Sequence, residues 1–133
     1  MMKRILAGVI AVLIVSFVGL YFITGPSQKI EGKVILDDAK TFVITGANLR
    51  FFINGAENPV IKVKEGDKVR IEFTSTEGFH DWVVDEFGAA TEKVNAGGST
   101  FVEFTADKKG TFEYYCSVGK HRENGMKGVF IVE

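Results

Sequence analysis

The sequence predicts an all-β fold, a Greek-key sandwich or barrel of about seven or eight strands, preceded by one N-terminal transmembrane helix. Three observations support this prediction. After Thr41, apolar and polar residues alternate in short runs rich in β-branched and aromatic side chains; Gly, Asn, Asp or Pro interrupts these runs; and no long amphipathic helical period is present. With 133 residues, 46% of them hydrophobic, the chain is sufficient for one packed core. We therefore expect one folded domain over residues 41–133.

The first 24 residues differ in composition from the rest of the chain. Lys3 and Arg4 precede an apolar run over residues 5–23, in which Ser16 is the only clearly polar side chain. This run is long enough to cross a bilayer, and only a poor signal-peptidase site follows it. We predict an uncleaved anchor over residues 1–24 that leaves the domain on the extracytoplasmic side, in the periplasm or at the cell surface, because the flanking basic residues stay in the cytoplasm. The alternative is secretion after signal cleavage.

Residues 25–40 are predicted to form a linker or a first strand. The linker begins with the breaker-rich sequence Gly-Pro-Ser-Gln, and residues 33–36 have the composition of a short strand. The pattern leaves both interpretations open. The net charge of the whole chain is -1 and like charges form no long run, so the sequence does not favour nucleic acid or an anionic surface as a partner.

Eight segments within the domain are strand candidates, and turn sequences separate them. The alternation is regular in residues 69–74, 100–104, 111–115 and 128–132. It is weaker in residues 42–45, 49–53, 60–63 and 82–84. Glycine-containing turns are predicted at residues 65–67, 86–88, 96–98 and 107–110. Alternation with a period of two means that each strand buries one face, so we expect two sheets packed against each other.

Three residues with metal-binding side chains lie in one short stretch. They are Cys116, His121 and Met126, which are the only Cys, one of the two His, and the only Met beyond the N-terminus. Two imidazoles, one thiolate and a weak axial thioether form a ligand set that selects copper. The second imidazole has one candidate, His80. The sequence therefore predicts a site for a single copper ion.

The spacing of these residues predicts that they converge from a loop. Cys116, His121 and Met126 are five residues apart, and five residues leave a rotation of about 140° on a helix, so one helical face cannot hold them. Cys116 follows the strand predicted over residues 111–115, and Met126 precedes the next predicted strand. His80 follows the strand predicted over residues 69–74. We expect two sheets to hold the metal between them.

This stretch resembles the ligand loop of the cupredoxins, the blue-copper proteins, in the form Cys-x₄-His-x₄-Met of rusticyanin-like and auracyanin-like members. The similarity extends to residues 59–69, 110–116 and 128–132. The resemblance implies a cupredoxin-like fold with one type 1 copper ion. It also implies that His80, Cys116 and His121 are the equatorial ligands, and that Met126 is the long axial ligand.

Asp81 departs from the pattern of the cupredoxins. Many members carry Asn after the first His ligand, and this Asn bonds to the Ser or Thr that follows the Cys; here the pair is Asp81 and Ser117. A carboxylate only accepts hydrogen bonds, so the Ser117 hydroxyl or a backbone N–H must donate to it. A negative charge so close to copper favours Cu(II), and we expect it to lower the reduction potential.

The predicted function is one-electron transfer, and we expect no enzymatic activity. Four protein ligands leave no open position for a small-molecule substrate, so electrons pass through His121 to redox proteins that dock briefly. Lys120, Arg122 and Lys127 flank the ligand stretch. We interpret them either as solvated surface charge or as a basic rim that guides an acidic partner.

Other copper proteins provide alternative interpretations. A multicopper oxidase or nitrite reductase domain needs further histidines for a second copper centre, and a binuclear terminal-oxidase domain needs two cysteines. The chain has two His and one Cys. Copper storage, delivery or sensing would use the same ligands without a redox partner, and the sequence alone does not separate these functions from electron transfer.

Overall fold

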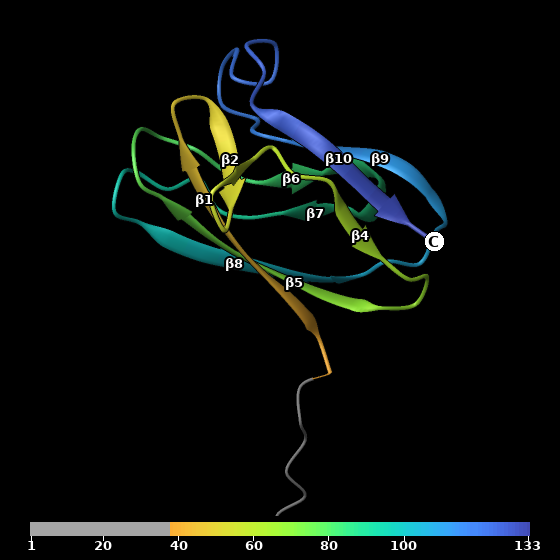
Figure 1. The fold of residues 1–133 in the computed structure, drawn as a ribbon. Coiled ribbons are helices and arrows are strands. Elements are labelled where there is room, and N and C mark those ends of the chain that lie inside the picture. Colours follow the sequence, from red (N-terminus) through yellow and green to blue (C-terminus); the bar gives the residue numbers. More distant parts are fainter. Residues whose placement is uncertain (1–37) are drawn as a thin grey trace, which may run out of the picture. The chain divides into compact units, whose positions relative to one another are not determined.

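The computed structural model describes residues 38–133, which form two five-stranded β-sheets facing each other (Figure 1). The only helical element among these residues is a single 3₁₀ turn, η1 (Asp85–Phe87). Within the described part of the chain, no helix has the length and apolar character needed to cross a membrane. The predicted anchor over residues 1–24, and the possible strand over residues 33–36, lie outside the described residues.

The first sheet has the strand order β3-β2-β1-β5-β8. Its strands are β1 (Lys40–Ala47), β2 (Arg50–Ile53), β3 (Ala56–Glu57), β5 (Lys68–Ser75) and β8 (Ser99–Thr105). Strands β1 and β5 are parallel, and the other neighbours are antiparallel. The buried positions in β5 alternate with less buried ones, as its alternating sequence predicts.

The second sheet has the strand order β4-β10-β9-β6-β7. Its strands are β4 (Ile61–Val63), β6 (Val83–Val84), β7 (Ala89–Ala90), β9 (Gly110–Tyr115) and β10 (Lys127–Val132). Strands β4 and β10 are parallel, whereas β9 pairs antiparallel with both β10 and β6. The predicted ligand stretch therefore connects the end of β9 to the start of β10, its antiparallel neighbour.

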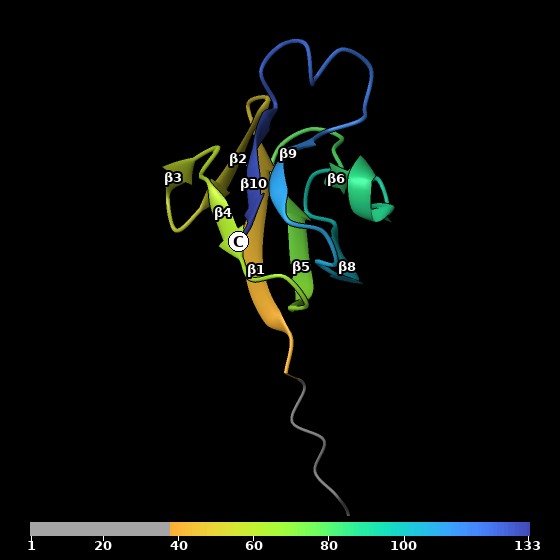
Figure 2. The same cartoon turned by 90° about the vertical axis from the view of Figure 1, so that its right-hand side faces the viewer.

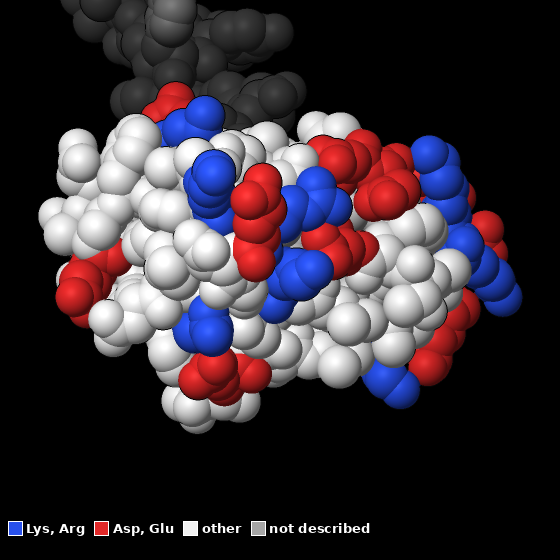
Figure 3. All heavy atoms as spheres, turned by 90° about the horizontal axis from the view of Figure 1, so that it is seen from above, with Lys and Arg blue, Asp and Glu red and all other residues white. Residues whose placement is uncertain are grey.

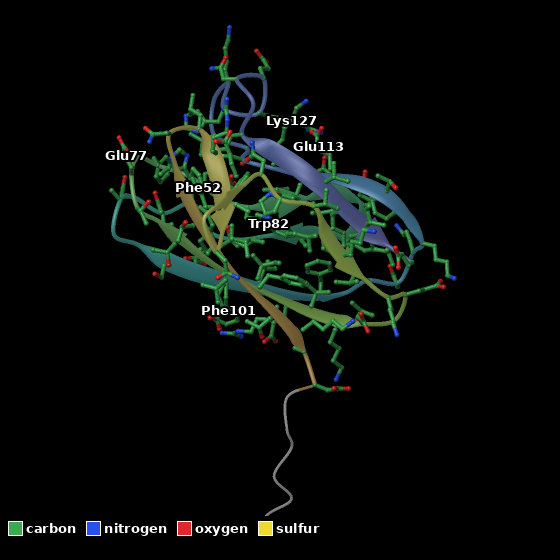
Figure 4. All side chains as sticks on the ribbon, viewed as in Figure 1. Phe52, Glu77, Trp82, Phe101, Glu113 and Lys127 are labelled. Carbon is green, nitrogen blue, oxygen red and sulfur yellow. The ribbon has the colours of Figure 1, made fainter. Side chains whose placement is uncertain are left out.

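Aromatic side chains fill the space between the sheets. Trp82 is fully buried at the centre of the sandwich, as Figure 4 shows, and its ring stacks on Tyr114 with 5.7 Å between centroids. Tyr114 is anchored in turn, because its hydroxyl donates to the carbonyl of Pro59. Phe104 stacks on the Trp82 ring with 6.2 Å between centroids. Such rings bury large apolar areas in defined orientations, so this core holds both sheets rigidly below the predicted site.

All eight predicted strands of the domain are present within a few residues of their expected bounds. The weak prediction over residues 49–53 was wrong at its first residue, because Leu49 lies in the β1–β2 turn with φ 59° rather than in an extended strand. Two short strands, β3 and β7, were not predicted. Asn54 and Gly55 both have positive φ and form the β2–β3 turn, which is the usual two-residue hairpin chemistry.

Three segments meet at one end of the sandwich. The loop over residues 116–126, called the ligand loop below, rises beyond the ends of β9 and β10 (Figure 2). The β1–β2 turn, Asn48 and Leu49, lies at the same end, and a side chain of the adjoining strand bonds to the loop backbone. The segment after β5, which carries His80, completes this end.

Candidate metal centre

The structure brings His80, Cys116 and His121 together. Their potential ligand atoms all lie within 4.8 Å of one another. The two Nδ1 atoms of the imidazoles are 3.1 Å apart, and the Cys116 Sγ lies 3.8 Å from His80 Nδ1 and 3.5 Å from His121 Nδ1. Two nitrogens and one sulfur thus face a common centre.

The size of this triangle fits a metal ion. A triangle with edges of 3.1, 3.5 and 3.8 Å has a circumradius of about 2.0 Å, and bonds from a first-row metal such as zinc to imidazole nitrogen and thiolate sulfur are about 2.0–2.3 Å long. A metal at or near the centre of the triangle therefore reaches all three atoms. The donor set of two imidazoles and one thiolate matches copper by its chemistry.

His80 is immobilised by the backbone around it. Its N–H donates to Val94 O and its carbonyl accepts from Val94 N, at 3.1 and 2.9 Å. Its Nε2 lies 2.7 Å from the carbonyl oxygen of Glu77. A carbonyl only accepts, so Nε2 carries the proton and Nδ1 presents its lone pair to the triangle. Gly78 is required here, because a Cβ at this position would lie 2.8 Å from His80 Nε2.

The ligand loop is closed by its own backbone hydrogen bonds. The N–H of Cys116 donates to Met126 O at 3.1 Å, and the N–H of Met126 donates to His121 O at 2.9 Å. The N–H of His121 donates to Val118 O at 3.0 Å. These three bonds tie the residues that we expect to bind metal to one another, so their spacing in the sequence becomes proximity in space.

Met126 is fully buried beneath the loop. Its methyl carbon lies close to Gly46 of β1, because a Cβ on that glycine would be 3.2 Å from Met126 Cε. The side chain therefore extends from the second sheet toward the first.

Asp81 and Ser117 tie the His80 segment to the ligand loop. The carboxylate accepts two hydrogen bonds, from the Ser117 N–H at 2.7 Å and from the Ser117 hydroxyl at 2.5 Å. Asp81 is only 3% exposed, so both oxygens are held away from bulk water. The two groups that we expected as alternative donors both bond to Asp81.

Burial affects the ionisation of two residues of the triangle. It raises the pKa of the Cys116 thiol, because a thiolate loses solvation there. It lowers the pKa of His80, because burial disfavours the imidazolium. Metal binding requires a thiolate and a neutral imidazole, so burial favours the binding form of His80, whereas a bound cation must stabilise the Cys116 thiolate.

His121 differs from His80 because it is partly exposed. A hollow of about 330 Å³ opens beside both rings, and its apolar lining comes from Leu49, Phe79 and Val118. Phe79 is 42% exposed. The sequence analysis did not place Leu49 or Val118 at the site. The only indication in the sequence was that Leu49 lies near a turn and Val118 lies near the predicted ligands.

The charges near the loop are largely paired. Arg122 Nε donates to Glu113 Oε1 at 2.7 Å, Lys127 lies 3.5 Å from the same carboxylate, and the Arg122 guanidinium stacks 3.7 Å from the ring centre of Tyr115. Figure 3, which views this end of the molecule, shows basic and acidic side chains interleaved. Glu113 and Lys127 lie side by side in Figure 4. Arg122 also lies 4.0 Å from Asp85, so two of the three cations of the suggested basic rim are paired with carboxylates.

A family model described as "Cupredoxin-like domain" matches residues 13–132. The chain is 31% identical over 119 residues to a copper-containing nitrite reductase of Neisseria meningitidis serogroup A. That match covers 80% of this chain and 29% of the reductase, so the chain spans under a third of the length of this relative.

Among solved structures, auracyanin from Roseiflexus castenholzii is 26% identical, with a TM-score of 0.59 and coverage of 71% of this chain and 98% of auracyanin. Rusticyanin from Thiobacillus ferrooxidans is 23% identical, with a TM-score of 0.59 and coverage of 72% of this chain and 78% of rusticyanin. The rusticyanin likeness shows the fold.

Proposed function

Because the chain belongs to the cupredoxin-like domain family, we propose that it is a membrane-anchored blue-copper protein that carries one electron at a time. Its cofactor is copper. In this proposal His80, Cys116 and His121 are the equatorial ligands and Met126 is the axial ligand. The supporting observation is the convergence of two Nδ1 atoms and one Sγ on a triangle of metal-binding size.

Copper bound in this site supplies a one-electron Cu(II)/Cu(I) couple. The protein contributes a rigid ligand frame: backbone bonds from Val94 fix His80, and the bond between Met126 N and His121 O fixes the loop. Ligands held this firmly change position little when the charge of the site changes. The nearly complete burial of Cys116 and Met126 keeps water from the sulfur ligands. These properties favour outer-sphere electron transfer.

Electrons are proposed to enter and leave at the His121 edge. His121 is the partly exposed member of the triangle, and the hollow beside it is lined by Leu49, Phe79 and Val118. A redox protein that docks over this hollow approaches the imidazole without breaking any hydrogen bond of the site. Transient redox contacts are small, so a modest apolar surface is sufficient.

We assign no enzymatic activity to this chain. In the proposed coordination, four protein side chains surround the copper ion and leave no position for a substrate. The nitrite reductase of Neisseria meningitidis is more than three times as long as the matched segment, and this chain contains two histidines in total, both used in the proposed site. We therefore expect no nitrite reduction.

The domain is proposed to lie on the extracytoplasmic side of a membrane, held by residues 5–23. The support is the sequence alone, an apolar run preceded by Lys3 and Arg4. In cells that express the full chain, the protein should remain in the membrane fraction after a high-salt wash, and protease added outside the cytoplasmic membrane should digest the domain. Release by high salt, or protection from that protease, would contradict this placement.

Voltammetry of the copper-loaded protein separates a carrier from a storage or delivery protein. We expect one reversible wave for one electron, with full recovery of bound copper after many cycles. A copper protein that stores or delivers the metal would instead release it to a competing Cu(I) chelator upon reduction. Loss of the ion after a single reduction would contradict the carrier function.

A further inference from the structure

The hairpin formed by β2 and β3 holds the backbone of the ligand loop. Arg50, the first residue of β2, donates from Nη1 to the carbonyl of Asn124 at 3.1 Å and to the carbonyl of Leu49 at 2.8 Å. Its Nε donates to Glu57 Oε1 of β3 at 2.9 Å. One partly buried guanidinium thus connects the hairpin, the β1–β2 turn and the end of the loop.

Asn58 makes a second contact of the same kind. Its Oδ1 accepts a hydrogen bond from Phe51 N at 2.9 Å, which turns its amide nitrogen toward the loop. Nδ2 then donates to the carbonyl of Gly125 at 3.3 Å. Asn58 has φ 41°, a left-handed conformation that Asn tolerates better than most residues. The hairpin therefore fixes the position of Asn58 independently of its contact with the loop.

Gly125 has no side chain and so leaves room for the guanidinium of Arg50. Its φ of 96° disfavours any side chain, and a Cβ there would lie 3.0 Å from Arg50 Nη1. The guanidinium can therefore approach the Gly125 backbone and still bond to the neighbouring Asn124 carbonyl. This close approach requires a glycine at this position of the loop.

We propose that Arg50 and Asn58 are positioning residues that fix Met126 relative to Cys116 and His121. Asn124 and Gly125, whose carbonyls they hold, are the two residues directly before Met126. The bonds within the loop connect its residues only to one another, whereas these two contacts connect the loop to the first sheet. Because Arg50 is charged, its bonds to carbonyl oxygens are stronger than neutral ones.

The consequence for copper rests on the proposed function, in which Met126 is the axial ligand. Displacing the backbone before Met126 changes how closely its sulfur approaches the metal. The strength of that weak axial bond determines how far a site shifts from blue toward green, and it tunes the reduction potential. The β2–β3 hairpin would thus set the electronic character of a centre that it does not touch.

The test compares two variants with a matched control. Arg50→Met keeps the length of the side chain and removes all its donors. Asn58→Asp keeps the acceptor for Phe51 N and removes the donor to Gly125. Arg70→Met is the control, because Arg70 is likewise an arginine of the first sheet that pairs with carboxylates, here Glu72 and Glu103, and these ion pairs do not involve the loop.

Amide hydrogen exchange of the copper-free protein is the first measurement. We expect exchange at Met126 and Lys127 to become about tenfold faster in Arg50→Met and Asn58→Asp, the effect of about 1.4 kcal/mol of lost local stability. Arg70→Met should leave these two amides unchanged. Unchanged exchange in both test variants would overturn the proposal, and if Arg50→Met does not fold, Asn58→Asp decides.

The visible spectrum of the Cu(II) form is the second measurement. We expect both test variants to change the intensity ratio of the two thiolate-to-copper bands, and Arg70→Met to retain the parent ratio. Faster exchange with an unaltered ratio would overturn the link from Arg50 and Asn58 to the axial ligand. A parent protein that lacks the thiolate band would contradict the proposed function instead, and the exchange measurement would still decide whether the hairpin positions the loop.

Discussion

His80 and His121 present the same atom to Cys116 from two different kinds of structure. His80 lies in the segment after β5, is 3% exposed, and has its backbone paired with Val94 and its Nε2 bonded to Glu77 O. His121 lies in the ligand loop, is partly exposed, and borders the hollow lined by Phe79. The buried imidazole is suited to hold the metal, and the exposed one to exchange electrons.

The largest effect should come from removing each imidazole in turn. We expect His80→Gly and His121→Gly each to lower copper affinity by about 100-fold or more. Added imidazole should restore a thiolate-to-copper band in His121→Gly, because the vacated space opens to the hollow. It should restore the band less in His80→Gly, because His80 is only 3% exposed, although the hollow also borders its ring. Copper titrations of both variants at increasing imidazole concentration measure this rescue. Equal rescue of the two variants would contradict the distinction between the two histidines.

A smaller effect is expected from the carboxylate that joins the two regions. Asp81→Asn removes a buried negative charge next to His80 while keeping an acceptor for Ser117 N. Cu(II) loses stabilisation relative to Cu(I), so the reduction potential should rise by about 60 mV, a tenfold shift for one electron. Voltammetry measures the change directly. Ser117→Ala, which keeps the charge and loses one hydrogen bond, should shift the potential less; an equal shift would assign the effect to the bond rather than the charge.

The smallest effect concerns the charges beside His121. Arg122 is paired with Glu113, so Arg122→Gln should change the rate of oxidation by anionic hexacyanoferrate(III) by less than about threefold. Lys120→Gln should slow this reaction more, because no ion pair within the described part of the chain neutralises Lys120. Stopped-flow rates at low and high salt measure both. A larger effect of Arg122→Gln would support the hypothesis that Arg122 belongs to a basic rim that guides an acidic partner.

The fold could be predicted from sequence wherever a strand shows several alternations. Residues 69–74 alternate throughout, and β5 (Lys68–Ser75) is present there. The two-residue strand β7 (Ala89–Ala90) has too few residues for a period and exists because β6 pairs with it. The β2–β3 hairpin carried a signal, Asn54-Gly55, that the prediction did not use.

The site was partly predictable for similar reasons. Chemistry singled out Cys116 and the two histidines because these residue types are rare in this chain. The contact from Arg50 to the carbonyl of Asn124 joins residues that are 74 positions apart. Because the acceptor is a main-chain atom, no pattern of side chains in the sequence predicts this contact. The pairing of Arg122 with Glu113 depends on the register of the loop over β9, which sequence spacing does not determine.

The visible absorption spectrum of the Cu(II)-loaded protein, measured beside that of Cys116→Ser, tests the central claim most directly. Ser differs from Cys only in replacing the sulfur by oxygen, so the triangle keeps its two imidazoles. The account predicts intense thiolate-to-copper absorption at one copper per chain in the parent protein and no such absorption in the variant. A parent protein without this band, or a variant that binds copper with equal affinity, would contradict a copper centre built on Cys116.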